Sequence, residues 1–158
     1  MQPLSPVLDW TGQTFASGGW LQSGFKLEHR PQQEAMAMAT AQAFFSDQSL
    51  LVEAGTGVGK SLAYLVPGAL HALHAKRPFI VSSHTIALQE QLKNKDIPLV
   101  RELFRSTPEL EPFADFKVAL LVGRGNYLCG HRLAQAIQTK GDLFAQEEMA
   151  DLERIAHW

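Results

Sequence analysis

The chain has 158 residues, a formal net charge of −2, 46% hydrophobic and 19% charged residues, and one cysteine. This length suits one globular domain with a buried core, and a single cysteine excludes an internal disulfide, as expected in a reducing cytoplasm. Charge alone does not indicate a nucleic-acid partner, because there is no strongly basic tract. The N-terminus lacks a signal-peptide pattern, and no apolar run approaches the ~20 residues of a membrane span. We therefore expect a cytoplasmic protein without membrane contact.

The N-terminal third is expected to hold one extended segment and one helix. Residues 1–24 are rich in Gly, Ser, Gln and Pro without a sustained period, which predicts an extended lead-in anchored by Trp10 and Trp20. Pro31 suits the first position of a helix that runs to about Ser46. The apolar stripe expected on that helix consists of Ala35, Met38, Ala39, Gln42 and Phe45.

A strand, a glycine-rich loop and a second helix are expected next. Residues 50–54 are a short apolar run, typical of a buried strand, and the helix is expected from Lys60 to about Ala75. We expect Pro67 to kink this helix, because proline lacks the N–H that would bond one turn back. The helix carries an apolar stripe at helical spacing, formed by Leu62, Leu65, Val66, Ala69, Leu70 and Leu73.

The remaining chain continues to alternate between strands and helices. Strands are expected at 79–83 and 117–122, helices at 85–93 and 99–104 with an interruption at 94–98, a turn at 123–127, and helices at about 129–139 and 142–157. This alternation predicts an α/β fold with a parallel sheet flanked by helices. Ligands bind beyond the carboxyl ends of such strands, so the loops at 54–61, 82–85 and 123–126 are expected on one face.

The loop at residues 54–61 indicates polyphosphate binding. Glycines there adopt backbone angles that let N–H groups turn inward around a phosphate, and the helix that follows adds free N–H groups and a positive dipole end. Lys60 is expected to reach the β- and γ-phosphates and Ser61 to ligate Mg²⁺. The alternative is a flexible turn before a helix, which the flanking strand and helix disfavour. The predicted binding residues are Ala54, Gly55, Thr56, Gly57, Val58, Gly59, Lys60 and Ser61.

Several stretches, in this order, resemble one helicase family. Phe25 followed by RPQQ at 30–33 resembles the adenine-reading Q motif, and EAGTGVGKS at 53–61 resembles motif I of superfamily 2. SSHTIALQEQL at 82–92 resembles motif Ia, VGRGNYLC at 122–129 resembles the segment with the first cluster-ligating cysteine of iron–sulfur helicases, and GGWL at 18–21 resembles the lead-in of bacterial members. Together, residues 18–132 resemble the DinG branch of the DinG/XPD-like helicases. The resemblance implies a partial RecA-like P-loop motor domain at 25–128 and the start of a helical insert at 129–158.

The resemblance also implies roles for individual residues. Gln33 would bind the adenine edge with support from Arg30, although a solvated glutamine on a helix is equally compatible with the residues. Lys60 and Ser61 would serve catalysis. Ser83, His84 and Thr85 would contact single-stranded DNA, whereas the residues alone favour an N-cap by Thr85.

The resemblance further makes Cys129 the first ligand of a [4Fe–4S] cluster, and the alternative is a small buried thiol. Because such clusters need four thiolates and the chain has one cysteine, we expect a cluster only in a longer polypeptide.

The family activity is ATP- and Mg²⁺-dependent unwinding of forked DNA by translocation on single-stranded DNA, with an implied 5′ to 3′ direction. Hydrolysis also needs a metal-binding carboxylate, which the family supplies in an Asp-Glu-Ala-His box. No apolar run here ends in Asp-Glu, and the polar helix at 151–153 is a poor substitute. We therefore expect the chain to be an N-terminal part of a larger helicase, or a truncated gene product. It is expected to bind ATP but to hydrolyse it negligibly. Its expected partner is the rest of the helicase, including the second motor domain. The alternatives are a non-catalytic nucleotide-binding module and another P-loop phosphotransferase, such as a small kinase.

Overall fold

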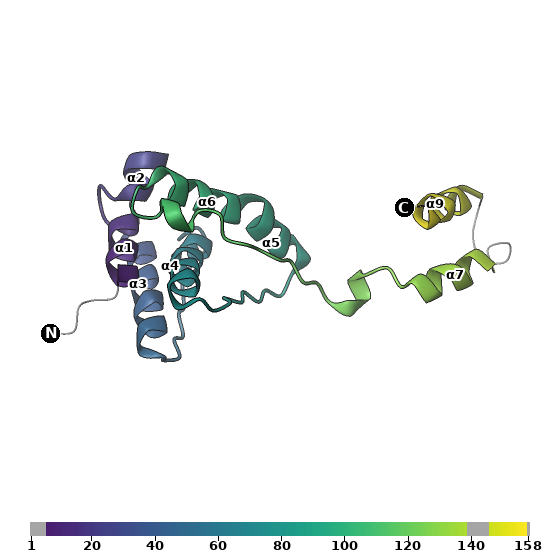
Figure 1. The fold of residues 1–158 in the computed structure, drawn as a ribbon, viewed down its shortest axis with the longest axis horizontal. Coiled ribbons are helices and arrows are strands. Elements are labelled where there is room, and N and C mark those ends of the chain that lie inside the picture. The colour runs from purple at the N-terminus through teal and green to yellow at the C-terminus, as the bar shows by residue number, and fades with distance from the viewer. Residues whose placement is uncertain (1–5, 139–145, 158) are drawn as a thin grey trace. The chain divides into compact units, whose positions relative to one another are not determined.

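The computed structural model describes residues 6–138 and 146–157, which belong to two compact units that divide after Leu120 (Figure 1). The first unit contains α1 (Pro6–Phe15), α2 (Trp20–Phe25), α3 (Pro31–Ser46), α4 (Lys60–Ala75), α5 (Ile86–Gln91), the π-helical turn η1 (Leu92–Asp96), α6 (Ile97–Ser106) and the 3₁₀ turn η2 (Glu111–Phe113). The second unit contains the 3₁₀ turn η3 (Arg124–Asn126), α7 (Gly130–Gln138) and α9 (Gln146–Ala156). Within the described ranges, none of the helices combines the length and apolarity that a membrane crossing requires.

The core of the first unit forms where α3 packs against α4 and α1 contacts both (Figure 1). Helix α4 has the bounds expected from the sequence and runs through Pro67 without a break. Its predicted stripe is confirmed, because Leu65, Val66 and Leu70 are buried and the other members of the stripe are half-buried. The kink expected at Pro67 stays a prediction.

Helix α3 has the expected bounds, but the stripe predicted for it is wrong. Its buried residues are Gln33, Ala37 and Ala41, whereas Ala35 and Phe45 are exposed. Alanines and methionines are spread around the whole helix, so no single face is marked as apolar by the sequence. The small side chains of Ala37 and Ala41 allow a neighbouring helix to approach closely, and the burial of Gln33 follows from a contact with the loop described below.

The N-terminal segment is helical, which corrects the expected extended lead-in at 1–24 over the part that is described. Helix α1 begins at Pro6, a residue suited to the first turn of a helix, and buries Val7 and Phe15 in the core. Its polar composition is misleading, because the buried hydroxyls of Thr11 and Thr14 donate to carbonyls one turn back at 2.7 Å each. The anchoring role of Trp10 and Trp20 is confirmed, since both pack against the core.

The three expected strands are not formed in the described chain, which corrects the predicted parallel sheet. Residues 50–54, 79–83 and 117–122 are outside any helix and form no strand. A strand exists only when its N–H and C=O groups pair with a neighbouring strand. These segments lack that pairing, so the apolar runs that predicted them remain single extended pieces of chain.

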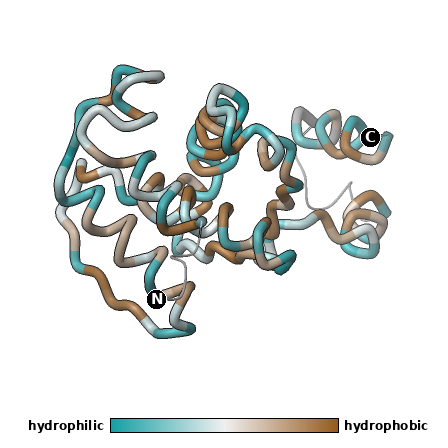
Figure 2. The backbone as a smooth tube through the Cα atoms, turned by 60° about the vertical axis from the view of Figure 1, so that its left-hand side comes forward, coloured by the Kyte–Doolittle hydropathy of each residue, from teal (hydrophilic) through white to brown (hydrophobic). Residues whose placement is uncertain are grey.

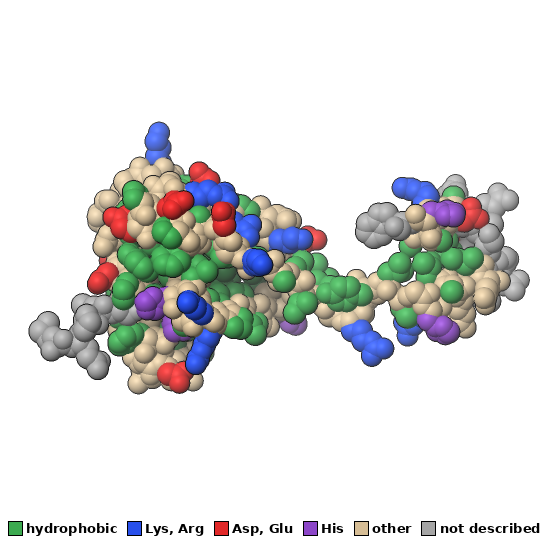
Figure 3. Space-filling model, viewed as in Figure 1, with side chains coloured by type: hydrophobic (Ala, Val, Ile, Leu, Met, Phe, Trp, Pro, Cys, Tyr) green, Lys and Arg blue, Asp and Glu red, His purple; other side chains and the backbone are tan. Residues whose placement is uncertain are grey.

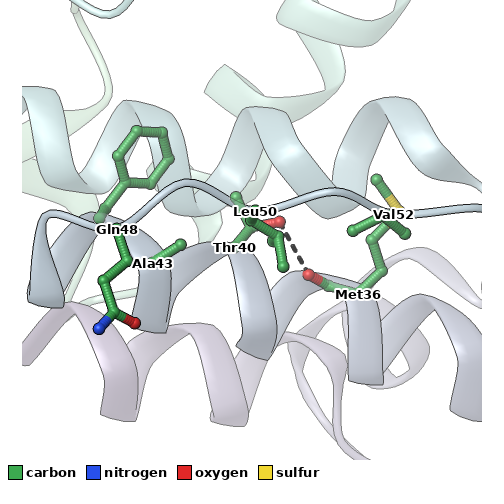
Figure 4. A pocket seen from close by; sticks show the side chains of 7 residues that line it. Met36, Thr40, Ala43, Gln48, Leu50 and Val52 are labelled. Carbon is green, nitrogen blue, oxygen red and sulfur yellow. Dashed lines mark hydrogen bonds between the residues drawn. The ribbon is translucent and has the colours of Figure 1, made fainter.

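Side-chain exposure along these segments still alternates as it does in a strand. Leu51 is 98% exposed between Leu50 at 45% and Val52 at 38%, and Ile80 is 83% exposed before Val81 at 38%. Leu50 and Val52 line a groove on α3 with Met36, Thr40, Ala43, Phe44 and Gln48 (Figure 4). Some of the hydrophobic stretches of the chain lie on non-helical backbone (Figure 2). Hydrophobic side chains are also visible at the surface (Figure 3).

The interruption expected at 94–98 takes the form of a π-helical turn within one continuous helical path from α5 to α6. The backbone N–H of Ile97 donates to the carbonyl of Leu92, five residues back. Pro98 follows and has no N–H, so it cannot donate the helical hydrogen bond of its position. The wider π-helical turn lies directly before this missing bond. Leu92 and Asp96 are the buried residues of η1.

The second unit consists of the turn η3 followed by α7 and α9, which contact each other. The expected turn at 123–127 is confirmed, because the Asn126 N–H donates to the Gly123 carbonyl at 2.8 Å. Both expected helices are present, and the connection at 139–145 lies outside the described residues. The expected domain division at 128/129 stays a prediction.

Candidate phosphate-binding site

The loop at 54–61 has the backbone that its glycines predict. Gly57 has φ +82° and Gly59 has φ +87°, angles that L side chains rarely adopt. Gly59 is the N-cap of the 16-residue helix α4, and no side chain caps that helix end. The N–H groups of the first turn are therefore available to an anion at the positive end of the helix dipole.

The ammonium group of Lys60 lies within this loop. Its Nζ donates to the carbonyls of Ala54 at 3.0 Å and Gly55 at 2.6 Å. These two bonds use two of its three donors. The loop thus contains a fixed positive charge beside the glycine backbone, which is the donor set that a polyphosphate requires.

Two side chains ahead of and within α3 hold the loop from its other side. Arg30 Nη1 donates to the Gly57 carbonyl at 2.5 Å, and Gln33 Nε2 donates to the Gly59 carbonyl at 2.9 Å. Both residues were expected at the adenine edge, and nothing in the sequence predicted their contacts with the loop. The adenine contact stays a prediction, since the bond to Gly59 uses only the amide donor of Gln33.

The contact between Gln33 and Gly59 leaves no room for a Cβ while the Gln33 amide keeps its present position. A Cβ placed on Gly59 would lie 2.2 Å from Gln33 Nε2 and 2.9 Å from its Cδ. A Cβ on Gly55 or Gly57 would meet nothing within 4 Å. The three glycines thus differ: a Cβ at Gly59 would meet both an unfavourable φ and the Gln33 amide, a Cβ at Gly57 would meet the unfavourable φ alone, and a Cβ at Gly55 would meet neither.

Ser61 is half-buried in the first turn of α4, one helical turn before Tyr64. Burial raises the pKa of the Tyr64 phenol, the Ser61 side chain lowers it and the Asp96 charge raises it, with a net upward shift. A loop with an inward ammonium, uncapped helical N–H groups and a hydroxyl fits a magnesium–triphosphate.

Ser83, His84 and Thr85 make local contacts. Thr85 is the N-cap of α5 and its hydroxyl accepts from the Leu88 N–H at 3.3 Å, while Ser83 Oγ donates to the Thr85 carbonyl at 3.2 Å. The N-cap role favoured by the residues alone is therefore confirmed. His84 is exposed, and the contact of these residues with DNA stays a prediction.

Cys129 is an exposed, free cysteine just before α7, which makes the buried-thiol alternative wrong. Its carbonyl accepts from the Leu133 N–H at 2.9 Å, so it belongs to the helix start. Throughout the described ranges, His, Cys, Asp and Glu form no group able to hold a metal ion. The described residues therefore do not fit a [4Fe–4S] cluster, which needs four thiolates.

Comparison with known proteins gives a consistent family match. Residues 29–111 match the model of the DEAD/DEAH box helicases. The chain is 45% identical over 125 residues to "ATP-dependent helicase DinG" of Mycobacterium tuberculosis, covering 77% of this chain and 18% of that protein. It is 43% identical over 135 residues to "ATP-dependent DNA helicase YoaA" of Escherichia coli, covering 85% and 19%. It is 36% identical over 115 residues to "3'-5' exonuclease DinG" of Bacillus subtilis, covering 73% and 12%.

The chain thus spans less than a fifth of the length of each of these three relatives. No solved structure gave a significant match.

Proposed function

Because the chain belongs to the DEAD/DEAH box helicase family, we propose that it is the ATP-binding part of a DinG-like, ATP-dependent DNA helicase. The observation that carries this proposal is the loop at 54–61, where Gly57 and Gly59 have positive φ angles beside the Lys60 ammonium and an uncapped helix end. In this proposal the loop N–H groups and Lys60 bind the β- and γ-phosphates of ATP. The Ser61 hydroxyl is a ligand of the accompanying Mg²⁺, which neutralises phosphate charge when it is bound.

Arg30 and Gln33 hold the loop in its binding shape within the same proposal. Each donates to a loop carbonyl, at Gly57 and Gly59 respectively. A carbonyl that accepts from Arg30 or Gln33 is turned toward that side chain, which leaves the N–H groups of the neighbouring peptides to face a phosphate. The free Oε1 of Gln33 is the acceptor that we assign to the adenine amino group.

The nucleic-acid partner in this proposal is single-stranded or forked DNA, with translocation from 5′ to 3′. Support comes from the relatives, two of which are named ATP-dependent helicases. Ser83, His84 and Thr85 are the proposed contacts, and the exposed side chains of His84 and Thr85 at the start of α5 are accessible to a phosphate backbone. Cys129 is proposed as one ligand of a cluster completed by cysteines that this chain does not contain.

Hydrolysis by this chain alone is expected to be negligible. No Asp-Glu pair occurs anywhere in its sequence, and phosphoryl transfer to water needs a carboxylate near the metal. This expectation separates the proposal from its alternatives. A small kinase would transfer phosphate to an acceptor in the absence of DNA. A non-catalytic module would bind nucleotide but release no phosphate, even when DNA is added to a longer form of the protein.

The direct test is an equilibrium titration of the chain with a fluorescent ATP analogue and Mg²⁺. Lys60→Ala is expected to weaken binding by at least about tenfold, because it removes the one ammonium inside the loop. Lys117→Ala is the matched control, since this exposed lysine lies outside the loop, and its affinity should equal that of the unaltered chain. Equal binding by the Lys60→Ala variant would place the nucleotide elsewhere and overturn the proposal.

A further inference from the structure

His29 and Glu34 are joined by a hydrogen bond across the N-terminus of α3. His29 Nε2 lies 2.7 Å from Glu34 Oε2, and both side chains are half-buried. Because a carboxylate only accepts hydrogen bonds, Nε2 is the donor. Arg30 and Pro31, the N-cap and the first residue of α3, lie between the two partners in the sequence. This bond, the His29–Glu34 clasp, therefore closes a short ring of chain around the point where the helix begins.

The clasp joins the two positions at which many helices carry a hydrophobic staple. With Arg30 as the N-cap, His29 is the residue before the cap and Glu34 is the fourth residue of the helix. An apolar pair at these positions fixes the angle at which the chain enters a helix. Here a hydrogen bond between polar side chains joins the same positions. The Glu34 carboxylate also lies in the first turn of α3, where the helix dipole favours negative charge.

Arg30 is the residue whose direction depends on this entry angle. Its backbone is extended, with φ −128° and ψ 107°, and its Nη1 donates to the Gly57 carbonyl of the phosphate loop. Pro31 restricts the residue before it to extended angles, so Arg30 is constrained from its C-terminal side. The clasp constrains it from its N-terminal side. Gln33 depends less on the clasp, because it lies within the helix.

The surroundings of the Arg30 guanidinium hold it only weakly. Its side chain is 45% exposed, and its Nη2 lies 3.8 Å from Oε2 of Glu28, whose side chain is 80% exposed. An exposed ion pair of this kind contributes little. Arginine also has many rotamers, and those that miss the Gly57 carbonyl leave the loop unheld. A fixed backbone direction at Arg30 limits these rotamers, so the clasp determines how often the guanidinium reaches the loop.

We propose that His29 and Glu34 are positioning residues that hold Arg30 against the phosphate loop and thereby raise the affinity of the loop for nucleotide. The inference rests on the proposed function, in which the loop at 54–61 binds ATP. When the clasp is open, Arg30 reaches Gly57 in a smaller fraction of molecules, and the apparent affinity falls by that fraction. A pair that only stabilised the start of α3 would leave the affinity of the folded chain unchanged.

The test is a titration of the folded chain with a fluorescent ATP analogue and Mg²⁺. His29→Ala and Glu34→Ala each open the clasp and are expected to weaken binding about two- to tenfold, the range of one hydrogen bond. The variant with both changes should lose no more than either single variant, because both remove the same bond. Glu34→Gln keeps an acceptor oxygen for Nε2 and should retain most of the affinity. Glu28→Gln is the matched control, since it alters the neighbouring exposed carboxylate, and it should bind as the unaltered chain does.

A second set of variants shows whether the clasp acts through Arg30. Arg30→Ala removes the contact with Gly57 and should weaken binding at least as much as His29→Ala does. Adding His29→Ala to Arg30→Ala should then cause no further loss of affinity. Circular dichroism in urea establishes conditions under which every variant is folded, so that affinities are compared between folded chains.

Each outcome decides for or against the inference. A loss of affinity in His29→Ala that disappears when Arg30 is already alanine supports it. Unchanged binding by His29→Ala, or an equal loss with and without Arg30, overturns it while the phosphate-loop proposal stands. Absence of nucleotide binding by the unaltered chain overturns the proposed function and the inference with it.

Discussion

Replacing the three loop glycines one at a time with alanine separates backbone strain from side-chain overlap. Gly59→Ala places a non-glycine residue at φ +87° and ψ +34°, in the left-handed region. This conformation costs about 1–2 kcal/mol for an L residue. The new Cβ also overlaps the Gln33 amide, 2.2 Å from Nε2 in the present geometry. Gln33 must then turn away and lose its bond to the Gly59 carbonyl, which adds about 1 kcal/mol.

The expected loss for Gly59→Ala is therefore about 2–3 kcal/mol in the free energy of unfolding. At about 2–4 °C for each kcal/mol in a domain of this size, the melting temperature should fall by about 4–12 °C. Gly57→Ala has the φ penalty without overlap and should cost about 1–2 kcal/mol. Gly55→Ala, with neither, should stay within about 0.5 kcal/mol.

Urea unfolding followed by circular dichroism measures all three variants on one scale. The double variant Gln33→Ala/Gly59→Ala completes the experiment, because removing the amide relieves the overlap, and its loss should be smaller than the sum of the two single losses. The reasoning is refuted if Gly59→Ala is no more costly than Gly55→Ala. It is also refuted if the losses of Gln33→Ala and Gly59→Ala simply add.

Three further predictions concern the helices around the loop. Gly68→Ala should lower the free energy of unfolding by about 1–3 kcal/mol through overpacking, since its Cβ would lie 2.3 Å from the Phe79 ring. Gly24→Ala, in open space within α2, is the control and should be neutral or stabilising in the same urea assay. Thr85→Ala should cost about 1 kcal/mol through loss of the cap on the Leu88 N–H, and an unchanged unfolding midpoint would refute that role. Because the folded-state pKa of Tyr64 is raised above its ordinary 10.0, the unfolded chain loses that proton first as pH rises. Stability should therefore fall above pH 10 more steeply in the unaltered chain than in Tyr64→Phe, and equal slopes would contradict the assignment.

The phosphate loop and its helix were predictable because their physics is local. Glycine at positive φ, a lysine and a serine at a helix start all act within eight consecutive residues. The bounds of α4 and its stripe followed from apolar residues at helical spacing after the glycine-rich loop. The same holds for the cap at Thr85, where a hydroxyl and an N–H three residues on suffice.

The sheet was not predictable in the same way, because strand pairing depends on chain segments far apart in the sequence. An apolar run such as 79–83 indicates only that the segment tends to be extended and half-buried. Exposure differs between Ile80 and Val81 as it would in a strand, although no neighbouring strand pairs with this described segment. The helix α1 was missed for the opposite reason. Its threonines satisfy their hydroxyls within the helix, so a polar composition conceals a buried segment.

Contacts between distant segments account for the missed parts of the site. The sequence placed Arg30 and Gln33 near a nucleotide but gave no sign that they donate to the carbonyls of Gly57 and Gly59. The burial of Asp96 was not predictable either, because its turn η1 contacts α4, a helix far away in the sequence.

The central claim is that backbone N–H groups of the loop surround a triphosphate. Amide resonances of the uniformly ¹⁵N-labelled chain, recorded before and after addition of ATP and Mg²⁺, test it directly. The account predicts that the largest shifts occur at Gly57, Gly59, Lys60 and Ser61 and disappear in Lys60→Ala. Shifts confined to other parts of the chain, or none at saturating ATP, would contradict it.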